Sequence, residues 1–210
     1  MNRRCVIVGG ARIVDYDRIR SLCRPTDYFI YCDSGLSHKQ RLKAEPNLIV
    51  GDFDSYKRPL TDTEIIALPR EKDDTDTVYA AKEAVRRGFE EFLLVGMIGG
   101  RFDHSLGNLG LLLMLDGLRK KAVLADDFSL MEIVSGKGCE VFGGCLFFSL
   151  FAVDGPADGV TITGAKYEVS EQSFRMENAC LGVSNEVRDG ETARIRVRTG
   201  RLLLVSVFRE

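Results

Sequence analysis

The chain has 210 residues, 45% of them hydrophobic, which is enough for one large domain or two small ones with a substantial core. Its formal net charge is −2, and its basic residues form only short runs such as Arg119-Lys120-Lys121. This composition argues against nucleic-acid binding, which needs a strongly basic surface. The apolar run at residues 5–8 is too short for a secretion signal, so we expect a cytoplasmic protein that does not bind membranes.

The cysteines show no spacing that is typical of a metal site. Several of them lie in apolar runs, where a thiol behaves as a small hydrophobic group. The sequence therefore predicts structural thiols, and neither zinc ligands nor disulfides, at Cys5, Cys23, Cys32, Cys139, Cys145 and Cys180.

The first half of the chain alternates short apolar runs with helical patterns. Buried strands are predicted at residues 5–8, 28–32, 48–50, 92–98 and 122–125, and each is followed by Gly or Asp. Helices are predicted at residues 77–87, with Gly88 as a stop signal, and at residues 106–118. This alternation predicts a mostly parallel α/β sheet, in which ligands bind beyond the carboxyl ends of the strands.

The pattern changes after about residue 128. Short apolar runs separated by Gly, Asp and Pro predict strands at residues 130–134, 140–142, 145–151, 160–163, 182–184, 192–198 and 202–207. Residues 193–198 alternate strictly between apolar residues and arginine, as expected of a strand buried on one face only. We therefore expect an α/β domain at residues 1–127 and an antiparallel β-sandwich domain at residues 128–210.

Aspartates are concentrated near predicted strand ends and helix starts. They form two groups, Asp52 and Asp54 after one strand, and Asp73, Asp74 and Asp76 before a helix. Carboxylates this close repel one another unless a hard cation neutralises them, so we predict a Mg²⁺ site that takes a polyphosphate. An Asx-turn is an alternative explanation for the first pair. Helix capping by Thr75 or Asp76 explains one member of the second group but not all three.

A third polar segment follows the strand predicted at residues 92–98. The glycine pair at residues 99–100 allows close backbone approach to a ligand, and Arg101 suits a phosphate oxygen or a stacked base. Asp103 and His104 add a carboxylate and an imidazole, although a hydrogen-bonded structural role explains His104 equally well. Lys72, beside the second aspartate group, fits either a phosphate contact or a surface position.

In this order and spacing, these segments resemble the thiamine pyrophosphokinase (thiamine diphosphokinase) family. The resemblance is carried by Asp33-Ser34-Gly35, Gly51-Asp52-Phe53-Asp54-Ser55, Lys72-Asp73-Asp74-Thr75-Asp76, Gly99-Gly100-Arg101-Phe102-Asp103-His104 with Asn108, Gly164-Ala165-Lys166-Tyr167 and Val183-Ser184-Asn185-Glu186. It implies a catalytic α/β domain that binds ATP and Mg²⁺, and a β-sandwich domain that binds thiamine and forms a homodimer. The implied active site lies at the subunit interface, where the pyrophosphoryl group of ATP is transferred to the thiamine hydroxyl and AMP is released.

The resemblance also implies roles for individual residues. The implied Mg²⁺ ligands are Asp52, Asp54 and Asp76. The implied nucleotide-binding residues are Asp33, Gly51, Asp52, Lys72, Asp73, Gly100, Arg101, His104 and Asn108. The implied thiamine-binding residues are Ser184, Asn185 and Tyr167. The implied catalytic residues are Asp54, Asp76, Arg101 and Asp103.

Two segments depart from the family pattern. Asp33-Ser34-Gly35 stands where many members have Asp-Gly-Gly, and residues 164–169 lack the Leu and Pro that are often found there. The chain also has no Trp, so any ring stacked on thiamine must be Tyr or Phe, with Tyr167 and Phe174 as candidates.

The predicted mechanism depends on positioning and charge neutralisation. Mg²⁺ bridges the carboxylates and the triphosphate, Arg101 and Lys72 offset developing charge, and the thiamine hydroxyl attacks the β-phosphorus in line. Asp76 or Asp103 could accept the proton late. Two other hypotheses stay open at this point. One is a Mg²⁺-dependent phosphohydrolase that uses water as the acceptor, and the other is a nucleotide-sensing or scaffold module without catalysis.

Overall fold

A computed structural model describes residues 3–54, 57–71 and 73–209, and the chain divides into two compact units, Met1–Asp127 and Phe128–Glu210. Each unit has its own buried core. Within the described residues, no helix combines the length and apolar character that crossing a bilayer requires.

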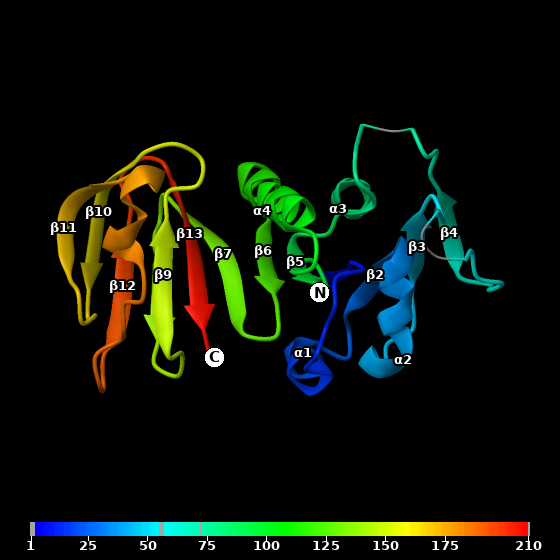
Figure 1. Ribbon diagram of the computed structural model, residues 1–210, viewed down its shortest axis with the longest axis horizontal. Coiled ribbons are helices and arrows are strands. Elements are labelled where there is room, and N and C mark those ends of the chain that lie inside the picture. The colour runs from blue at the N-terminus through cyan, green and yellow to red at the C-terminus, as the bar shows by residue number, and fades with distance from the viewer. Residues whose placement is uncertain (1–2, 55–56, 72, 210) are drawn as a thin grey trace. The chain divides into compact units, whose positions relative to one another are not determined.

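Parallel strands form the centre of the first unit (Figure 1). The strands are β1 (Arg4–Val8), β2 (Tyr28–Cys32), β3 (Leu48–Gly51), β4 (Glu64–Ala67), β5 (Glu91–Val95) and β6 (Lys121–Ala125). They pair in parallel in the order β4-β3-β2-β1-β5-β6. The order reverses between β1 and β5, so the carboxyl ends of these two strands form the switch point at which doubly wound sheets bind ligands.

Helices cover both faces of this sheet. In Figure 1, α1 (Tyr16–Leu22) and α2 (Lys39–Leu42) lie on one face, and α3 (Asp76–Arg86) and α4 (Phe102–Gly117) lie on the other. A 3₁₀ helix, η1 (Asp33–His38), leads from β2 into α2. Because α3 packs on β1, β2 and β3, its first turn reaches the carboxyl edge of the sheet.

The sequence predicted the central strands and the helix α3 of this unit correctly, but some boundaries differ. β5 ends at Val95 and not at residue 98, because Gly96 adopts a left-handed φ of 64° and turns the chain. α4 begins at Phe102, one turn before the predicted start, so the Asp103 and His104 positions belong to a helix and not to a loop. The short elements α1, η1, α2 and β4 were not predicted.

The second unit is a β-sandwich. One sheet has the antiparallel order β7 (Ser129–Ser135), β13 (Arg201–Val207), β9 (Phe147–Phe151). The other has the antiparallel order β11 (Val169–Phe174), β10 (Ala157–Thr163), β12 (Thr192–Arg196), β8 (Cys139–Phe142). Phe148 and Leu204 from the first sheet share a buried core with Ile162 and Ile195 from the second. The predicted fold class, an α/β domain followed by an antiparallel sandwich, is confirmed.

Residues 193–198 are buried on one face only, as predicted. Ala193, Ile195 and Val197 are buried, and the arginines between them are exposed. The strand predicted at residues 182–184 is wrong. Residues Met176–Gly182 form a 3₁₀ segment, η2, and Ser184 has a left-handed φ of 55° that is incompatible with a strand. The strand β11 was not predicted from the sequence.

Candidate active site

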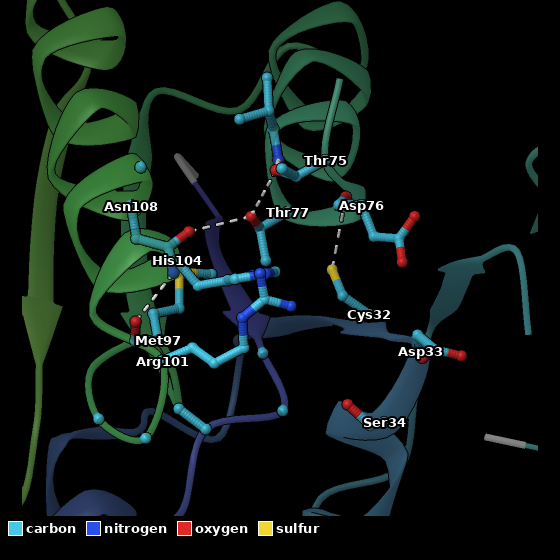
Figure 2. A pocket seen from close by; sticks show the side chains of 18 of the residues that line it. Cys32, Asp33, Ser34, Thr75, Asp76, Thr77, Met97, Arg101, His104 and Asn108 are labelled. Atoms are coloured by element: carbon cyan, nitrogen blue, oxygen red, sulfur yellow. Dashed lines mark hydrogen bonds between the residues drawn. The ribbon is translucent and has the colours of Figure 1, made fainter. Parts of the chain in front are cut away.

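A cavity of about 710 Å³ lies at the carboxyl edge of the parallel sheet (Figure 2). Its walls come from the segments that follow β1, β2, β3 and β5 and from the first turns of α3 and α4. The volume is in the range that holds a small-molecule ligand. The cavity therefore occupies the place where the strand order predicts a binding site.

Three carboxylates meet in this cavity. Asp33 follows β2, and Asp52 and Asp54 follow the neighbouring strand β3. One oxygen atom from each of the three carboxylates lies within 4.8 Å of the others. Asp33 and Phe53 have left-handed φ values of 41° and 58°, so the backbone turns sharply at both strand ends. Such turns allow side chains from adjacent strands to face one ion.

The electrostatics of Asp33 fit a cation site. The residue is 7% exposed, and its Oδ1 atom is buried without a hydrogen-bond partner among the described residues. Burial raises the pKa of the Asp33 carboxyl above 3.8, and the negative charges of Asp76, Asp52 and Asp54 raise it further, against a lowering by the Ser34 backbone N–H. A hard divalent cation such as Mg²⁺ would supply the missing partner and relieve the repulsion.

Asp76 lines the same cavity from the first turn of α3. Thr75 is the N-cap of this helix, and its side chain accepts a hydrogen bond from the Val78 backbone N–H. The Cys32 thiol donates to the Asp76 carbonyl oxygen at 3.7 Å, which ties the end of β2 to the start of α3. Among the described residues, the three-carboxylate cluster contains Asp33, which the sequence assigned to the nucleotide, and does not contain Asp76.

A chain of hydrogen bonds joins α3 to α4 and to the loop after β5, as Figure 2 shows. The Thr75 and Thr77 hydroxyls lie 3.1 Å apart, and the Thr77 hydroxyl donates to Asn108 Oδ1 at 3.0 Å. Asn108 Nδ2 donates to the Met97 carbonyl oxygen at 2.8 Å. Asn108 was predicted to bind the nucleotide. Since both ends of its buried amide have protein partners, Asn108 also positions the elements that line the cavity, and its contact with the nucleotide stays a prediction.

The loop after β5 contributes a basic side chain. Gly99 and Gly100 have positive φ values of 118° and 65°, and Arg101 precedes the first residue of α4. The Arg101 guanidinium forms a two-pronged ion pair with Asp103, at 3.2 Å for Nε and 2.6 Å for Nη2. This pair lowers the pKa of Asp103, so its carboxylate is a weak proton acceptor. His104 also lines the cavity, and its backbone N–H donates to Asp103.

Asp73 and Gly51, which were also predicted to bind the nucleotide, are not among the residues that line the cavity. Asp73 is exposed and does not line the cavity, and Lys72 is outside the described residues. Gly51 is the buried last residue of β3, where a Cβ atom would lie 3.1 Å from the Cβ of Asp33. The missing side chain of Gly51 therefore makes room for Asp33, and a contact with the nucleotide stays a prediction.

The segment after β1 was not predicted to contribute to the site. Gly9, Gly10, Ala11 and Arg12 all line the cavity. A Cβ atom at Gly9 would lie 2.6 Å from the Gly96 carbonyl oxygen, so the loops after β1 and β5 pack too closely for any side chain there. The available signal was the Gly9-Gly10 pair after the first predicted strand.

The predicted thiamine-binding residues belong to the second unit. Asn185 is buried, and its Oδ1 accepts hydrogen bonds from the backbone N–H groups of Tyr167 at 3.0 Å and Glu186 at 2.9 Å. Its Nδ2 donates to the Tyr167 carbonyl oxygen at 2.8 Å. Asn185 therefore fixes the backbone beside Tyr167, whose side chain is 58% exposed. Ser184 is exposed, and its backbone N–H donates to Ser149 Oγ.

Two family models match the chain, one in each unit. The model described as thiamin pyrophosphokinase, catalytic domain, matches residues 19–124. The model described as thiamin pyrophosphokinase, vitamin B1 binding domain, matches residues 145–202.

Curated relatives carry the same description. Thiamine pyrophosphokinase 1 of Oryza sativa subsp. japonica is 27% identical over 174 residues, which cover 74% of this chain and 64% of the rice protein. Thiamine pyrophosphokinase 2 of Arabidopsis thaliana is 25% identical over 213 residues, which cover 89% of this chain and 71% of that protein. The match to the rice relative thus spans slightly less than two thirds of its length.

Solved structures share the fold over the whole chain. The thiamine pyrophosphokinase of Bacillus subtilis has a TM-score of 0.87 at 20% identity, covering 99% of this chain and 100% of that chain. The protein of Geobacillus thermodenitrificans, also described as a thiamin pyrophosphokinase, has a TM-score of 0.82 at 23% identity and covers 97% of both chains. At these identities the likeness establishes the fold.

Proposed function

Because this chain belongs to the thiamin pyrophosphokinase family, we propose that it transfers the pyrophosphoryl group of ATP to the hydroxyl of thiamine and releases AMP. The observation that carries the proposal is the meeting of Asp33, Asp52 and Asp54 in a cavity that also contains Arg101. Such a cavity suits a metal-bound polyphosphate, which needs carboxylates for the cation and a guanidinium for the phosphate oxygens. The relatives are described as thiamine pyrophosphokinases, and no feature of the described cavity favours water as the acceptor.

Asp33, Asp52 and Asp54 are the residues that would hold Mg²⁺. The buried Oδ1 of Asp33, which has no hydrogen-bond partner among the described residues, supports this assignment. When bound, the ion would neutralise phosphate charge and so favour attack on phosphorus.

Arg101 contributes to phosphate binding in this mechanism. Its guanidinium is held by Asp103 in the free protein, and it turns its donors to the phosphate oxygens when the nucleotide binds. The loop after β5 and the first turn of α4 would help to hold the reactants in line, which lowers the entropic cost of bringing them together.

The bond changes are those of a pyrophosphoryl transfer. The thiamine hydroxyl oxygen forms a bond to the β-phosphorus, and the bond from that phosphorus to the bridging oxygen of the α-phosphate breaks. AMP leaves with the electron pair of the broken bond. We assign the hydroxyl proton to Asp76, because it lines the cavity and, among the described residues, does not belong to the three-carboxylate cluster that would hold Mg²⁺.

The second unit supplies the acceptor site in this proposal. Tyr167 and Ser184 are exposed and can offer a ring and a hydroxyl to thiamine, while Asn185 supports the backbone between them. The family resemblance supports a cytoplasmic homodimer in which each active site uses both subunits. These features remain part of the proposal.

The test is a reaction with purified protein, ATP, MgCl₂ and thiamine, followed by mass spectrometry for thiamine diphosphate and AMP. We expect both products in equal amounts, and neither when thiamine or MgCl₂ is omitted. Release of phosphate or AMP without thiamine would instead identify a phosphohydrolase. Tight nucleotide binding without any product would identify a sensing module.

A further inference from the structure

Arg12 lines the cavity, but the mechanism above gives it no role. Its side chain is exposed and forms no hydrogen bond or ion pair with any residue that the structure describes. Arginines near this cavity and elsewhere in the first unit are held by carboxylates, in the pairs Arg4–Asp27, Arg24–Glu91, Arg87–Glu64 and Arg101–Asp103. Arg12 therefore offers a guanidinium that is available to an anionic ligand.

The backbone that carries Arg12 is fixed on the side of β5. The Gly9 N–H donates to the Val95 carbonyl oxygen at 2.9 Å, and the Ala11 N–H donates to the Gly96 carbonyl oxygen at 2.8 Å. These bonds join the loop after β1 to the end of its neighbour in the sheet. An arginine on a rigid loop loses less conformational entropy on binding than one on a flexible loop.

The same loop is fixed from its other side by a buried histidine. His38 Nε2 lies 3.0 Å from the Ala11 carbonyl oxygen, and His38 Nδ1 lies 2.6 Å from the Tyr16 hydroxyl. Burial lowers the pKa of His38, so the imidazole is neutral, with Nε2–H donating to Ala11 and Nδ1 accepting from Tyr16. The Arg41 guanidinium lies 3.8 Å from the centre of the Tyr16 ring and supports it.

The sheet order sets the sequence of charges along the cavity edge. From β3 to β2, β1 and β5, the strand ends carry Asp52 and Asp54, then Asp33, then Arg12, and then Arg101. The three carboxylates of the cluster lie at one end of this row and the two guanidinium groups at the other, where Asp103 is paired with Arg101. A metal-bound polyphosphate has the same polarity, with the cation at one end and uncompensated oxygens along the rest of the chain.

We infer that Arg12 binds the polyphosphate of the nucleotide donor, between the three-carboxylate cluster and Arg101. This inference rests on the proposed function for the identity of the ligand. In the free protein Arg101 is engaged by Asp103, whereas Arg12 has no such competing partner among the described residues, so Arg12 can capture the phosphates before the Arg101 pair opens.

The test measures binding without the acceptor, by isothermal titration calorimetry with MgCl₂. The probes are α,β-methylene-ATP, which cannot undergo the transfer, and inorganic tripolyphosphate. We expect Arg12→Ala to raise the Kd for both probes by about 10- to 100-fold, since hydrogen bonds to charged groups are worth that much. Arg12→Lys should recover part of the affinity, because it restores the charge but not the planar fork.

The matched control is Arg119→Ala, which removes an exposed arginine at the other end of α4, away from the cavity. It should bind both probes like the wild type. Arg12→Ala should also keep the wild-type Tm within about 1 °C, because an exposed side chain without partners adds little stability.

Equal affinities of Arg12→Ala and the wild type for both probes would overturn the inference. A loss seen with the nucleotide analogue but not with tripolyphosphate would also overturn it, because Arg12 would then contact the nucleoside. So would a wild-type protein that binds neither probe. A wild-type protein that binds both probes but forms no thiamine diphosphate would refute only the proposed function.

Discussion

Asp33 combines burial with the repulsion of neighbouring carboxylates, and both effects raise its pKa above 3.8. In the folded state Asp33 therefore holds its proton at pH values where the unfolded chain has lost it. The contribution of this proton to the free energy of unfolding is fully present below pH 3.8. It is lost as the pH rises through the pKa that Asp33 has in the folded state. At neutral pH without a cation, the ionised Asp33 is a source of instability.

Replacing the Asp33 carboxyl by an amide tests whether the ionised side chain destabilises the folded protein. We expect Asp33→Asn without metal to raise the Tm at pH 7 by about 2–4 °C, because the repulsion disappears. The difference from the wild type should shrink as the pH falls toward 3.8, where Asp33 is protonated as well. MgCl₂ should raise the Tm of the wild type but not that of the variant. Differential scanning calorimetry at several pH values measures all three effects. An equal MgCl₂ response in both proteins would exclude Asp33 as a ligand.

Asp54 is an exposed member of the same cluster, so its replacement should affect activity more than folding. We expect Asp54→Ala to lower turnover by about 10²-fold, as for the loss of one preorganised charged group. The measurement is AMP formation over a MgCl₂ titration. Asp62→Ala is the control, because Asp62 is exposed and does not line the cavity. Wild-type turnover in Asp54→Ala at every MgCl₂ concentration would contradict the assigned role.

The elements around the cavity depend on the hydrogen bonds that join α3 to α4. Thr77→Val keeps the side-chain shape but removes the bond to Asn108, and we expect a loss of about 1 kcal/mol in unfolding free energy. Asn108→Ala also leaves the buried Met97 carbonyl oxygen without its partner, so about 1–3 kcal/mol should be lost.

A double-mutant cycle tests whether Thr77 and Asn108 stabilise the protein through their shared hydrogen bond or independently of each other. In urea unfolding, the combined variant should lose less than the sum of the two single losses, because both variants remove the same bond. The kcat should fall with little change in the KM for thiamine, since Asp76 and Arg101 lie on the connected elements. Strict additivity would show that Thr77 and Asn108 do not act together.

Element prediction from the sequence worked where a strand is fully apolar and ends in Gly or Asp. The runs at β1, β2, β3 and β6 show this pattern, and parallel topology then brings their polar ends to one edge. It failed at the start of α4, where Phe102 is 80% exposed and gives no amphipathic signal. The hydrogen bonds that Asn108 and Asn185 donate to the backbone were also hidden, because a buried amide with backbone partners and an amide that binds a ligand look the same in a sequence.

The position of Arg12 in the cavity could not be predicted from the sequence. It is a single basic residue without a repeated pattern, and its position in the cavity follows from the β1–β5 pairing rather than from its neighbours in the chain. Only the strand order, which reverses between β1 and β5, reveals that Arg12 and Arg101 share an edge.

At the scale of the whole molecule, the two units carry separate parts of the proposed site. The proposed metal and nucleotide residues lie in Met1–Asp127, and the proposed thiamine residues lie in Phe128–Glu210. The second unit also exposes large apolar side chains, which is a feature of surfaces that meet a partner. They are Phe128, Phe142, Leu146, Tyr167, Met176, Leu181 and Val183. These observations support the proposed homodimer, which should sediment with twice the 23.4 kDa mass of one chain.

Mixing two damaged proteins tests whether the active site uses both subunits. Asp54→Ala disables the first unit, and Ser184→Ala should weaken thiamine binding by the second unit, so each protein alone should be slow when thiamine is below the wild-type KM. If each site combines the first unit of one chain with the second unit of its partner, a mixed dimer contains one site with both changes and one intact site. Random exchange at equal amounts should then restore about a quarter of wild-type activity, because about half of the dimers are mixed.

If each site instead lies within one chain, no mixed dimer contains an intact site, and the activity should stay at the average of the two variants. The exchange itself must be verified, for example by native mass spectrometry of differently tagged chains. Verified exchange without recovery would therefore refute the shared site and leave the homodimer intact, whereas a sedimentation mass of one chain would refute both. The two measurements together separate assembly from catalysis, because the first reports which chains associate and the second reports which surfaces the reaction uses.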